Sequence, residues 1–520
     1  MRPQIKYGLL AFLEGSSVMG TEILCGRWLS AIYGSSLYVW TAILSCTMLA
    51  LTIGYFLGGR FSQEKINDAL LAKQLLLASF GICAIPFLIS IIFPLTLSLG
   101  LLQASFLVTL LLLAIPFVSL ASTTPILGYL MHISRKEELS HSAGFIFSVS
   151  TIGGIISTYL IGLFIIELFG VYAPLLVLGS GLALCTLLIL KISIRPMIYY
   201  FAACLMAIFS SFYFYNPVWA STPGATLLYS GDGIMGNLRV EDINPNGGGM
   251  RQLVNNGAVQ SSIKRSDLSA VSNLRYVHTI AATASVLPRG SKVLLIGMAG
   301  GALVREFQDL GFSIDVVDID DRTYDLAKEY FYLDTTNVHF IEDDGRHFIK
   351  NCPARYDLAV IDISTSDSQP YYLYSYESFK EFKSILNPKG LLVINYIDFV
   401  YANKAHTTAQ IIKSLEAAEF FCLINNQVYK GIDLTGLSLG HLQEKIILAS
   451  QNEPFNTHRL DKSKMNACCL LQATSLDFMD PDYTAFSDSV EIIYDDRNTL
   501  DRDKMEIVHL YRIRNFSQFK

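Results

Sequence analysis

The chain has 520 residues, of which 52% are hydrophobic and 16% are charged, a composition that excludes an ordinary soluble globular protein, in which about 25% are charged. Residues 1–220 hold ten Lys or Arg and seven Asp or Glu, whereas the remaining residues hold 29 and 38, so the formal charge changes from +3 to −9. The acidic second part argues against nucleic-acid binding, which requires a basic surface.

Long apolar segments fill the first 220 residues. About 20 apolar residues are needed to cross the hydrocarbon core of a bilayer as a helix. We therefore predict an α-helical transmembrane bundle of about seven spans, near residues 7–27, 37–58, 70–92, 100–130, 143–168, 171–190 and 196–215. The fourth segment is long and contains Pro116 and Pro125, so it is either one kinked helix or two shorter ones.

Three glutamates, Glu14, Glu22 and Glu167, lie inside these apolar segments. An ionised carboxylate there costs roughly 3 kcal/mol unless it faces a partner or water. Two interpretations are open for Glu14 and Glu22: hydrogen bonds to neighbouring helices, with Arg27 as a further partner, or a path for a cationic amine. A face of small residues predicts close helix packing, and it consists of Gly144, Ser148, Gly153, Gly154 and Ser157.

Four strand-like segments follow one another between Ser291 and Asp362, and each ends in glycine or acid. The first is followed by the glycine-rich sequence GMAGGAL and then by a helical pattern. The second ends at Asp318, about twenty residues later, where a carboxylate can accept both hydroxyls of a ribose. The third ends at Glu342, Asp343, Asp344 and Gly345. This order predicts an open α/β, Rossmann-like sheet over residues 286–520 that holds a nucleoside-bearing cofactor.

Two of the acids at the strand ends need separate interpretation. Asp344 either accepts the amino group of adenine or only caps the helix that starts near Arg346. Asp362 ends the fourth strand at the carboxyl edge of the sheet, where a carboxylate faces the reacting centre. Beyond residue 403, the alternating sequences EKIILAS and VEIIYDD predict closing strands of the sheet.

The nine cysteines form no CxxC pair and have no histidine spacing typical of zinc sites. We therefore expect neither a metal ion nor a disulfide framework.

These motifs resemble the membrane-fused bacterial branch of the spermidine synthase family over essentially the whole chain. YSGDGIMGNLRVED, RQLVNNGAVQSS and SNLRYVHTIAA are similar to that family's small β-domain and gate, here residues 221–285. LLIGMAGGALVRE, VVDIDD, EDDGRHF and the strand ending in Asp362 resemble its cofactor and catalytic motifs in order. EGSSVMGTEILCGRWLSAIYGSS resembles its first membrane segment. YDDRNTLD resembles the DD-x-N-P ending of the fused proteins through Asp495, Asp496 and Asn498, with Thr499 in place of proline.

The resemblance implies aminopropyl transfer in polyamine biosynthesis. In that reaction a neutral amine attacks the carbon beside the sulfonium of decarboxylated S-adenosylmethionine, and methylthioadenosine is released. Asp362 is expected to accept the proton of the amine. Tyr276, His278 and Asp367 are expected to bind the substrate amine. Two roles are open for His278, that of a base and that of a hydrogen-bonding residue of the gate only. The residues expected to hold the cofactor are Gln260, Gly297, Gly301, Asp318, Asp344 and Gly345.

Three departures from the family pattern affect substrate choice. Where the family has an aspartate that holds the aminopropyl ammonium, this chain has Gly300. Where the family has its second catalytic acid, this chain has Thr365, and the next aspartate, Asp367, is two residues further on. Where the family has a glutamate in the gate, this chain has His278. Fewer carboxylates weaken the binding of a polycation, so the acceptor need not be putrescine. Gly300 also removes a charge that would repel ordinary S-adenosylmethionine. Two alternatives are therefore an S-adenosylmethionine-dependent methyltransferase and an inactive cofactor-sensing domain on a polyamine transporter.

The expected location is the bacterial inner membrane. Basic residues gather in alternate connections of the bundle, namely Arg2 and Lys6; Arg60, Lys65 and Lys73; Arg135 and Lys136; and Lys191 and Arg195. The positive-inside rule places these connections in the cytoplasm, and a seventh span would then place the catalytic part outside. Because adenosyl cofactors are kept in the cytosol, we expect a cytoplasmic catalytic domain. Either one span is then miscounted or residues 196–215 lie in the membrane interface, and the alternative is a catalytic domain outside the cell. The sequence also leaves a homodimer open.

Overall fold

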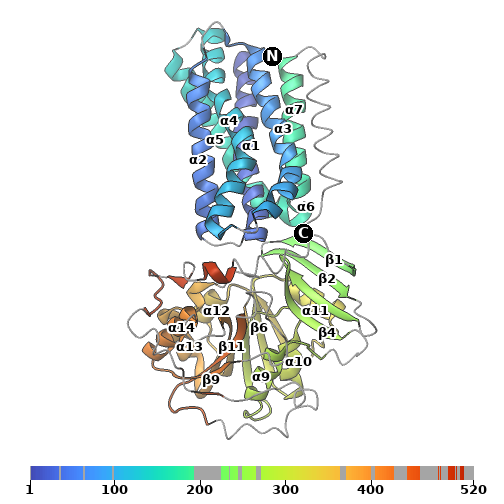
Figure 1. The fold of residues 1–520 in the computed structure, drawn as a ribbon, viewed down its shortest axis with the longest axis vertical. Coiled ribbons are helices and arrows are strands. Elements are labelled where there is room, and N and C mark those ends of the chain that lie inside the picture. The colour runs from blue at the N-terminus through green and yellow to red at the C-terminus, as the bar shows by residue number, and fades with distance from the viewer. Residues whose placement is uncertain are drawn as a thin grey trace. The chain divides into compact units, whose positions relative to one another are not determined.

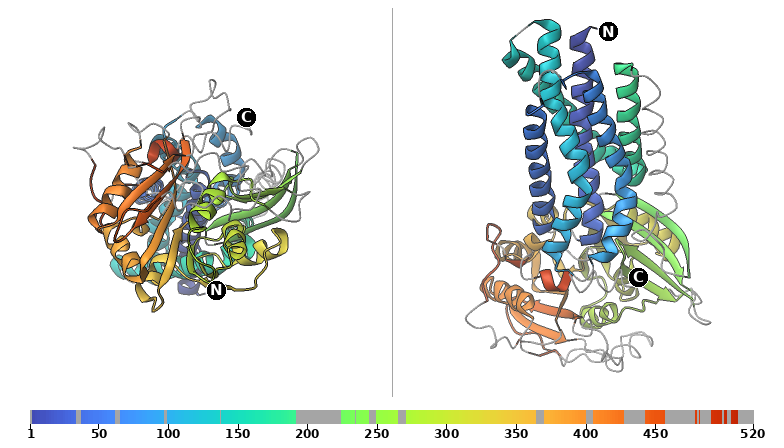
Figure 2. Two further views of the ribbon diagram at one scale, coloured as in Figure 1. Left: turned by 90° about the horizontal axis from the view of Figure 1, so that it is seen from below. Right: turned by 45° about the horizontal axis from the view of Figure 1, so that its top comes forward.

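The computed structural model (Figures 1 and 2) divides into two compact units, one built mainly from residues 1–220 and one mainly from residues 238–515. It describes residues 2–508 except 34–36, 62–64, 97–98, 137, 192–223, 234, 244–248, 265–270, 364–369, 400–404, 427–441, 457–477, 480, 482–489, 498 and 501–503.

The first unit is a bundle of long apolar helices. These are α1 (Pro3–Tyr33), α2 (Leu37–Gly59), α3 (Asp68–Leu95), α4 (Leu101–Arg135), α5 (Leu139–Leu160), which continues through a π-helical turn (Ile161–Ile165) into α6 (Ile166–Phe169), and α7 (Tyr172–Leu190). Within the described residues, six helical segments are long and apolar enough to cross a bilayer, and they match the first six predicted spans. The predicted seventh span, 196–215, lies outside the described residues. The fourth segment is one helix that contains both Pro116 and Pro125.

Small residues bring α1 and α5 into close contact, as the sequence predicts. A Cβ atom on Gly15 would lie 1.9 Å from the carbonyl oxygen of Ser150, and one on Gly153 would lie 2.2 Å from that of Phe12. Gly144, also predicted for this face, has no neighbour within 4 Å of its Cβ position. The close backbone contact between α1 and α5 therefore lies at Gly15 and Gly153, and Gly144 does not take part in it.

Glu14 is buried and hydrogen-bonded between helices. Ser150 of α5 donates to its carboxylate at 2.6 Å, and Thr124 of α4 donates at 3.4 Å. These contacts favour the first of the two interpretations of Glu14, a bond between neighbouring helices.

The second unit begins with a small sheet of four strands in the order β1 (Ala225–Gly233), β2 (Gly236–Ile243), β3 (Met250–Asn255) and β4 (Ala258–Lys264). Asn256 and Gly257 both have positive φ, which is typical of the type I′ turn that joins β3 to β4. Leu238, Val240 and Leu253 of this sheet form a hydrophobic cluster with the large domain's Leu326 and Phe331. The cluster fixes β4 close to the large sheet.

The large sheet has seven strands in the order β10-β11-β9-β8-β5-β6-β7. They are β5 (Lys292–Ile296), β6 (Ser313–Asp318), β7 (Val338–Glu342), β8 (Tyr356–Ile361), β9 (Leu386–Phe399), β10 (Phe421–Asn426) and β11 (Leu442–Ser450). Strands β5 to β9 run parallel to one another, whereas β11 is antiparallel to both β9 and β10. The chain order reverses at β5, between β6 and β8, and ligands of open α/β sheets bind at such a point. This is a Rossmann-like methyltransferase fold, as predicted.

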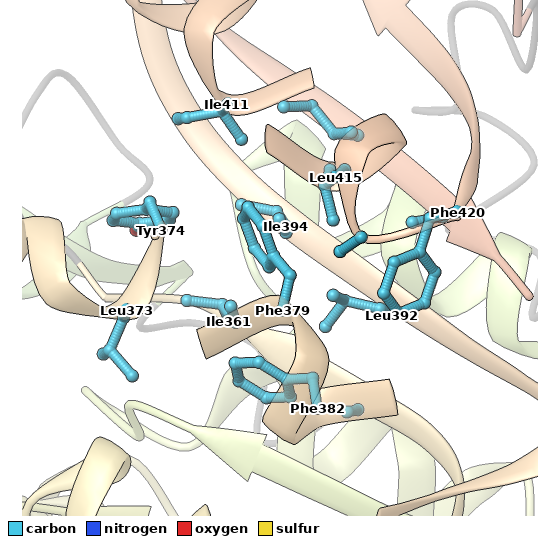
Figure 3. Close-up of a cluster of buried hydrophobic side chains, with 14 of the residues drawn as sticks. Ile361, Leu373, Tyr374, Phe379, Phe382, Leu392, Ile394, Ile411, Leu415 and Phe420 are labelled. Carbon is cyan, nitrogen blue, oxygen red and sulfur yellow. The ribbon is translucent and has the colours of Figure 1, made fainter. Parts of the chain in front are cut away.

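Helices cover both faces of this sheet (Figure 1). They are α9 (Arg275–Ala284), α10 (Ala302–Asp309), α11 (Arg322–Tyr330), α12 (Gly345–Asn351), the 3₁₀ turn η3 (Tyr371–Leu373), α13 (Tyr376–Ile385) and α14 (His406–Ala417). Figure 3 shows one face, where Ile361, Leu392 and Ile394 of the sheet pack against Phe379 and Phe382 of α13 and against Ile411 and Leu415 of α14. On the other face, side chains of α9 and α10 cover Leu295 and Val360.

The prediction of closing strands is half right. EKIILAS forms part of β11, but residues 490–494 are not a strand. The amide of Ile493 donates to the Ser414 hydroxyl, and its carbonyl accepts from the Tyr376 amide. The backbone of this segment is therefore bonded to helices α13 and α14, and a sheet edge is not needed to satisfy it.

Candidate active site

The glycine loop after β5 lies directly against the end of β8. Gly297 has a φ of +92°, and a Cβ atom there would lie 2.2 Å from the carbonyl oxygen of Asp362. Its amide donates to the Val317 carbonyl at 2.9 Å, which joins the ends of β5 and β6. Gly301, with a φ of +73°, ends the loop at the start of α10. Only glycine fits at Gly297, because the backbone at the end of β8 lies where a Cβ atom would be.

Asp318 lies at the end of β6 and holds the start of the glycine loop. Its carboxylate accepts the amide of Met298 at 2.8 Å and the amide of Asp320 at 3.0 Å. Burial raises the pKa of Asp318 to about 6, although these two N–H groups act in the opposite direction. Its carboxylate thus lies beside the glycine loop, and its role toward a ribose stays a prediction.

Asp344 caps α12. One carboxylate oxygen accepts the amides of Arg346 at 2.9 Å and His347 at 3.0 Å, and the other accepts the Tyr372 hydroxyl at 2.8 Å. The capping interpretation is therefore confirmed, and binding of adenine stays a prediction. At the next residue, Gly345, a Cβ would lie 2.7 Å from Cγ2 of Ile296, so α12 packs tightly on β5.

Asp362 directly follows β8, and two side chains from other elements hold its carboxylate. The Tyr276 hydroxyl of α9 donates to its Oδ2 at 3.1 Å, and the Asn395 amide of β9 donates to its Oδ1 at 2.8 Å. Burial raises the pKa of Asp362 to about 6, and the two hydrogen bonds lower it. A carboxyl group with such a pKa is ionised at neutral pH and can still accept a proton. The predicted pair Tyr276 and Asp362 is brought together.

Two further residues of this site are not among those predicted. Asn395 is the polar residue that follows the apolar run LLVI of β9, a signal that could have identified it. Tyr374 is fully buried, and its ring packs edge-on against Tyr396 with 5.6 Å between centroids. Its pKa is raised by burial and by the charge of Asp362. Among the described residues its hydroxyl has no hydrogen-bond partner.

His278 does not share the face of α9 that carries Tyr276. Residues two positions apart on a helix do not face each other. The ring of His278 is fully buried, with Nε2 2.9 Å from the Ser272 carbonyl oxygen and Nδ1 3.3 Å from the Glu306 carboxylate. These contacts favour the second of its two expected roles, hydrogen bonding within the gate.

The small sheet fills the space beside Gly300. The Gly300 amide donates to the hydroxyl of Ser261 at 2.9 Å, and a Cβ on Gly300 would lie 2.8 Å from that oxygen and 3.3 Å from a ring carbon of Phe331. An aspartate at this position would displace Ser261, which gives a physical reason for the departure from the family pattern. Gln260, predicted to hold the cofactor, is the residue before Ser261 on β4 and is partly exposed.

Three other predicted residues, Thr365, Asp367 and Asn498, lie outside the described residues. Within the part of the chain that is described, no group of three or more His, Cys, Asp or Glu side chains could hold a metal ion.

Comparisons with known proteins agree with the motifs. Residues 274–422 match the family model described as the spermine/spermidine synthase domain. An N-terminal histidine N-methyltransferase from Emericella nidulans is 29% identical over 141 residues, which are 26% of this chain and 25% of that protein. A polyamine aminopropyltransferase from Saccharolobus solfataricus is 27% identical over 142 residues, 24% of this chain and 47% of that protein.

The chain thus spans between a quarter and about half the length of these two curated relatives. The crystal structure of a probable spermidine synthase from Corynebacterium glutamicum is 19% identical, covers 54% of this chain and 99% of its own, and has a TM-score of 0.41. On the family model and the aminopropyltransferase relatives, residues 274–422 form a domain of the spermidine synthase-like family, a family of transferases.

Proposed function

We propose that the second unit is an aminopropyltransferase that uses decarboxylated S-adenosylmethionine as donor and a small amine as acceptor. The observation that carries the proposal is the environment of Asp362, whose carboxylate is held by Tyr276 and Asn395 beside the glycine loop. A partly buried carboxylate whose desolvation raises its pKa to about 6 suits a base that must accept a proton from an amine near neutral pH.

The residues of the strand edge fit a nucleoside-bearing donor. Gly297, where a Cβ atom would clash with the Asp362 carbonyl oxygen, lets the glycine loop turn tightly against the end of β8. Asp318 would accept the ribose hydroxyls, and Asp344 with Gly345 would bind the adenine. Gly301 and Gln260 complete the expected set. The donor supplies an electrophilic carbon beside its sulfonium.

The chain's own groups perform the proton transfer. Asp362 would accept the proton of the amine nitrogen as the new carbon–nitrogen bond forms and the carbon–sulfur bond breaks. Tyr276 and Asn395 would hold the carboxylate in place for that transfer. Asp367 is expected to bind the positive charge of the acceptor. Polyamine aminopropyl transfer releases methylthioadenosine, which is the product to be measured.

Methyl transfer from ordinary S-adenosylmethionine is the second candidate. It is favoured by the contact between Gly300 and Ser261, because a hydroxyl occupies the space where the family's members carry a negative charge. Without that charge, the carboxylate of ordinary S-adenosylmethionine is not repelled. The relative from Emericella nidulans is itself named as a methyltransferase.

We also propose that the helical unit anchors the enzyme in the bacterial inner membrane, with the catalytic unit in the cytoplasm. The six apolar helices support this proposal. The orientation can be tested with a reporter enzyme that is active only in the cytoplasm, fused to the C-terminus of the full chain. The fusion should be active if the catalytic unit is cytoplasmic and inactive if it is external.

Calorimetry on the full chain in detergent distinguishes the two chemistries. Decarboxylated S-adenosylmethionine, ordinary S-adenosylmethionine and methylthioadenosine are titrated separately. Aminopropyl transfer predicts that the decarboxylated donor and methylthioadenosine bind, and methyl transfer predicts preference for the ordinary donor. Binding of none of the three would exclude both.

A further inference from the structure

A buried arginine connects the C-terminal segment to the cofactor edge of the sheet. Arg346, in the first turn of α12, forms paired hydrogen bonds with two carboxylates from different parts of the chain. Nη2 donates to Oε1 of Glu381 at 3.0 Å and to Oδ2 of Asp495 at 3.0 Å, and Nη1 donates to Oδ1 of Asp495 at 3.2 Å. Nε also donates to Glu381. Two-pronged pairs of this kind fix geometry as well as charge.

The same guanidinium holds the segment that carries Tyr372. Nη1 of Arg346 donates to the Tyr372 carbonyl and, at 3.1 Å, to the Ser375 hydroxyl. The hydroxyl of Tyr372 in turn donates to Asp344 at 2.8 Å. Arg346 therefore determines where η3 lies, and η3 determines whether Tyr372 reaches the carboxylate of Asp344.

Asp495 is the distant member of this group, 149 residues after Arg346. It also accepts the Ser375 hydroxyl at 2.5 Å, and its own amide donates to Glu377 at 3.0 Å. Ser375 is the N-cap of α13. Asp495 thus contacts both sides of η3, through Arg346 before it and Ser375 after it.

Glu381 alone would still balance the charge of Arg346 if Asp495 were removed. The loss of Asp495 would therefore not leave a buried cation without a partner, which is the costly case. What would be lost is the second pair of bonds that orients the guanidinium and the hydrogen bond that fixes Ser375. The expected consequence is displacement of η3 in a domain that still folds.

We propose that Asp495 is a positioning residue for cofactor binding. Its hydrogen bonds to Arg346 and Ser375 fix the position of η3 and so maintain the hydrogen bond from the Tyr372 hydroxyl to Asp344. This inference rests on the proposed function, because Asp344 is a cofactor residue only there. It assigns a role to Asp495, the first residue of the DD-x-N motif, which lies outside the region matched by the family model.

The test measures binding of methylthioadenosine to the full chain in detergent. The variants are Asp495→Asn, Tyr372→Phe and their double variant. Asp495→Asn is expected to weaken binding about tenfold, and the double variant is expected to bind no more weakly than Tyr372→Phe alone, because both changes act on one contact. A purely structural role for Asp495 would give additive losses.

Glu491→Gln is the matched control, since Glu491 lies in the same segment and, among the described residues, its side chain forms an exposed ion pair with Arg497 at 2.9 Å. It should bind methylthioadenosine as the wild type does. Asp495→Glu, which keeps the charge, should recover most of the affinity and serves as the milder variant if Asp495→Asn does not fold.

Unchanged affinity in Asp495→Asn, or additive losses in the double variant, would overturn the proposal. If the wild type itself binds no methylthioadenosine, the proposed function fails instead, so the two failures are distinguishable.

Discussion

The hydroxyl of Tyr276 donates a 3.1 Å hydrogen bond to Asp362 across 86 residues of sequence. Tyr276 belongs to the helix that precedes the large sheet, and Asp362 belongs to the end of its fourth strand. The bond therefore places the expected base at the point where the glycine loop and β8 meet.

Removal of the base should abolish turnover without removing the nucleoside site. Asp362→Asn is expected to lower the rate of methylthioadenosine release by roughly 10²–10⁴-fold, the usual contribution of a general base. Its affinity for methylthioadenosine should stay within about twofold of the wild type. Asp357→Asn, at the opposite end of β8, is the control and should retain the rate. Equal losses in both variants would indicate a general defect of the strand.

The pH dependence of the rate should report the same carboxyl group. Because Asp362 must be ionised to accept a proton and its pKa is raised to about 6, the rate should rise with pH through about 6. Tyr276→Phe removes a hydrogen bond to the charged form, so the midpoint should move upward and the rate above it should fall roughly tenfold. Tyr356→Phe, which removes a hydroxyl bonded to Asp315 at 2.7 Å, should leave the midpoint unchanged. A profile that Tyr276→Phe does not shift would exclude this role.

Asp362 should also make the fold less stable at neutral pH than at pH 4. A carboxyl group whose folded pKa is raised binds its proton more tightly in the folded state, so its ionisation costs stability as pH rises from its ordinary pKa to about 6. Between pH 4 and pH 8, Asp362→Asn should gain up to about 3 kcal/mol of unfolding free energy relative to the wild type. Denaturant unfolding of both proteins at the two pH values measures this. An equal difference between the proteins at both values would contradict the raised pKa.

The contact of Gly300 with Ser261 should control the choice of donor. Gly300→Asp alone should destabilise the fold, because its Cβ would lie 2.8 Å from the Ser261 hydroxyl. Combined with Ser261→Gly, it should be tolerated and should bind decarboxylated S-adenosylmethionine roughly tenfold better relative to the ordinary form. Ser261→Gly alone is the control. Calorimetry with both donors gives the ratio, and a ratio equal to that of the control would refute the role of this position.

Much of the fold could be predicted because each local pattern agreed with the tertiary structure. The apolar run before Gly297 and the acids at Asp318 and Asp362 mark strand ends that do meet at one edge. Residues 490–494 alternate between apolar and polar side chains as a strand does, but their backbone is hydrogen-bonded to α13 and α14. Such tertiary contacts cannot be read from the periodicity of the sequence.

The contacts that complete the site could not be predicted in the same way. Asn395 is 33 residues from Asp362, and Asp495 is 149 residues from Arg346. Neither pair is related by helical or strand spacing, so only the topology of the sheet brings the partners together. Ser261 is similar, because its contact with Gly300 depends on how the small sheet packs on α11.

The most direct test of the account is mass spectrometry of the products that the full chain makes from decarboxylated S-adenosylmethionine and a mixture of small amines. We expect methylthioadenosine together with an amine heavier by one aminopropyl group in the wild type, and neither product in Asp362→Asn. Release of methylthioadenosine at the same rate by both proteins, or no new amine from a wild type that binds the donor, would contradict it.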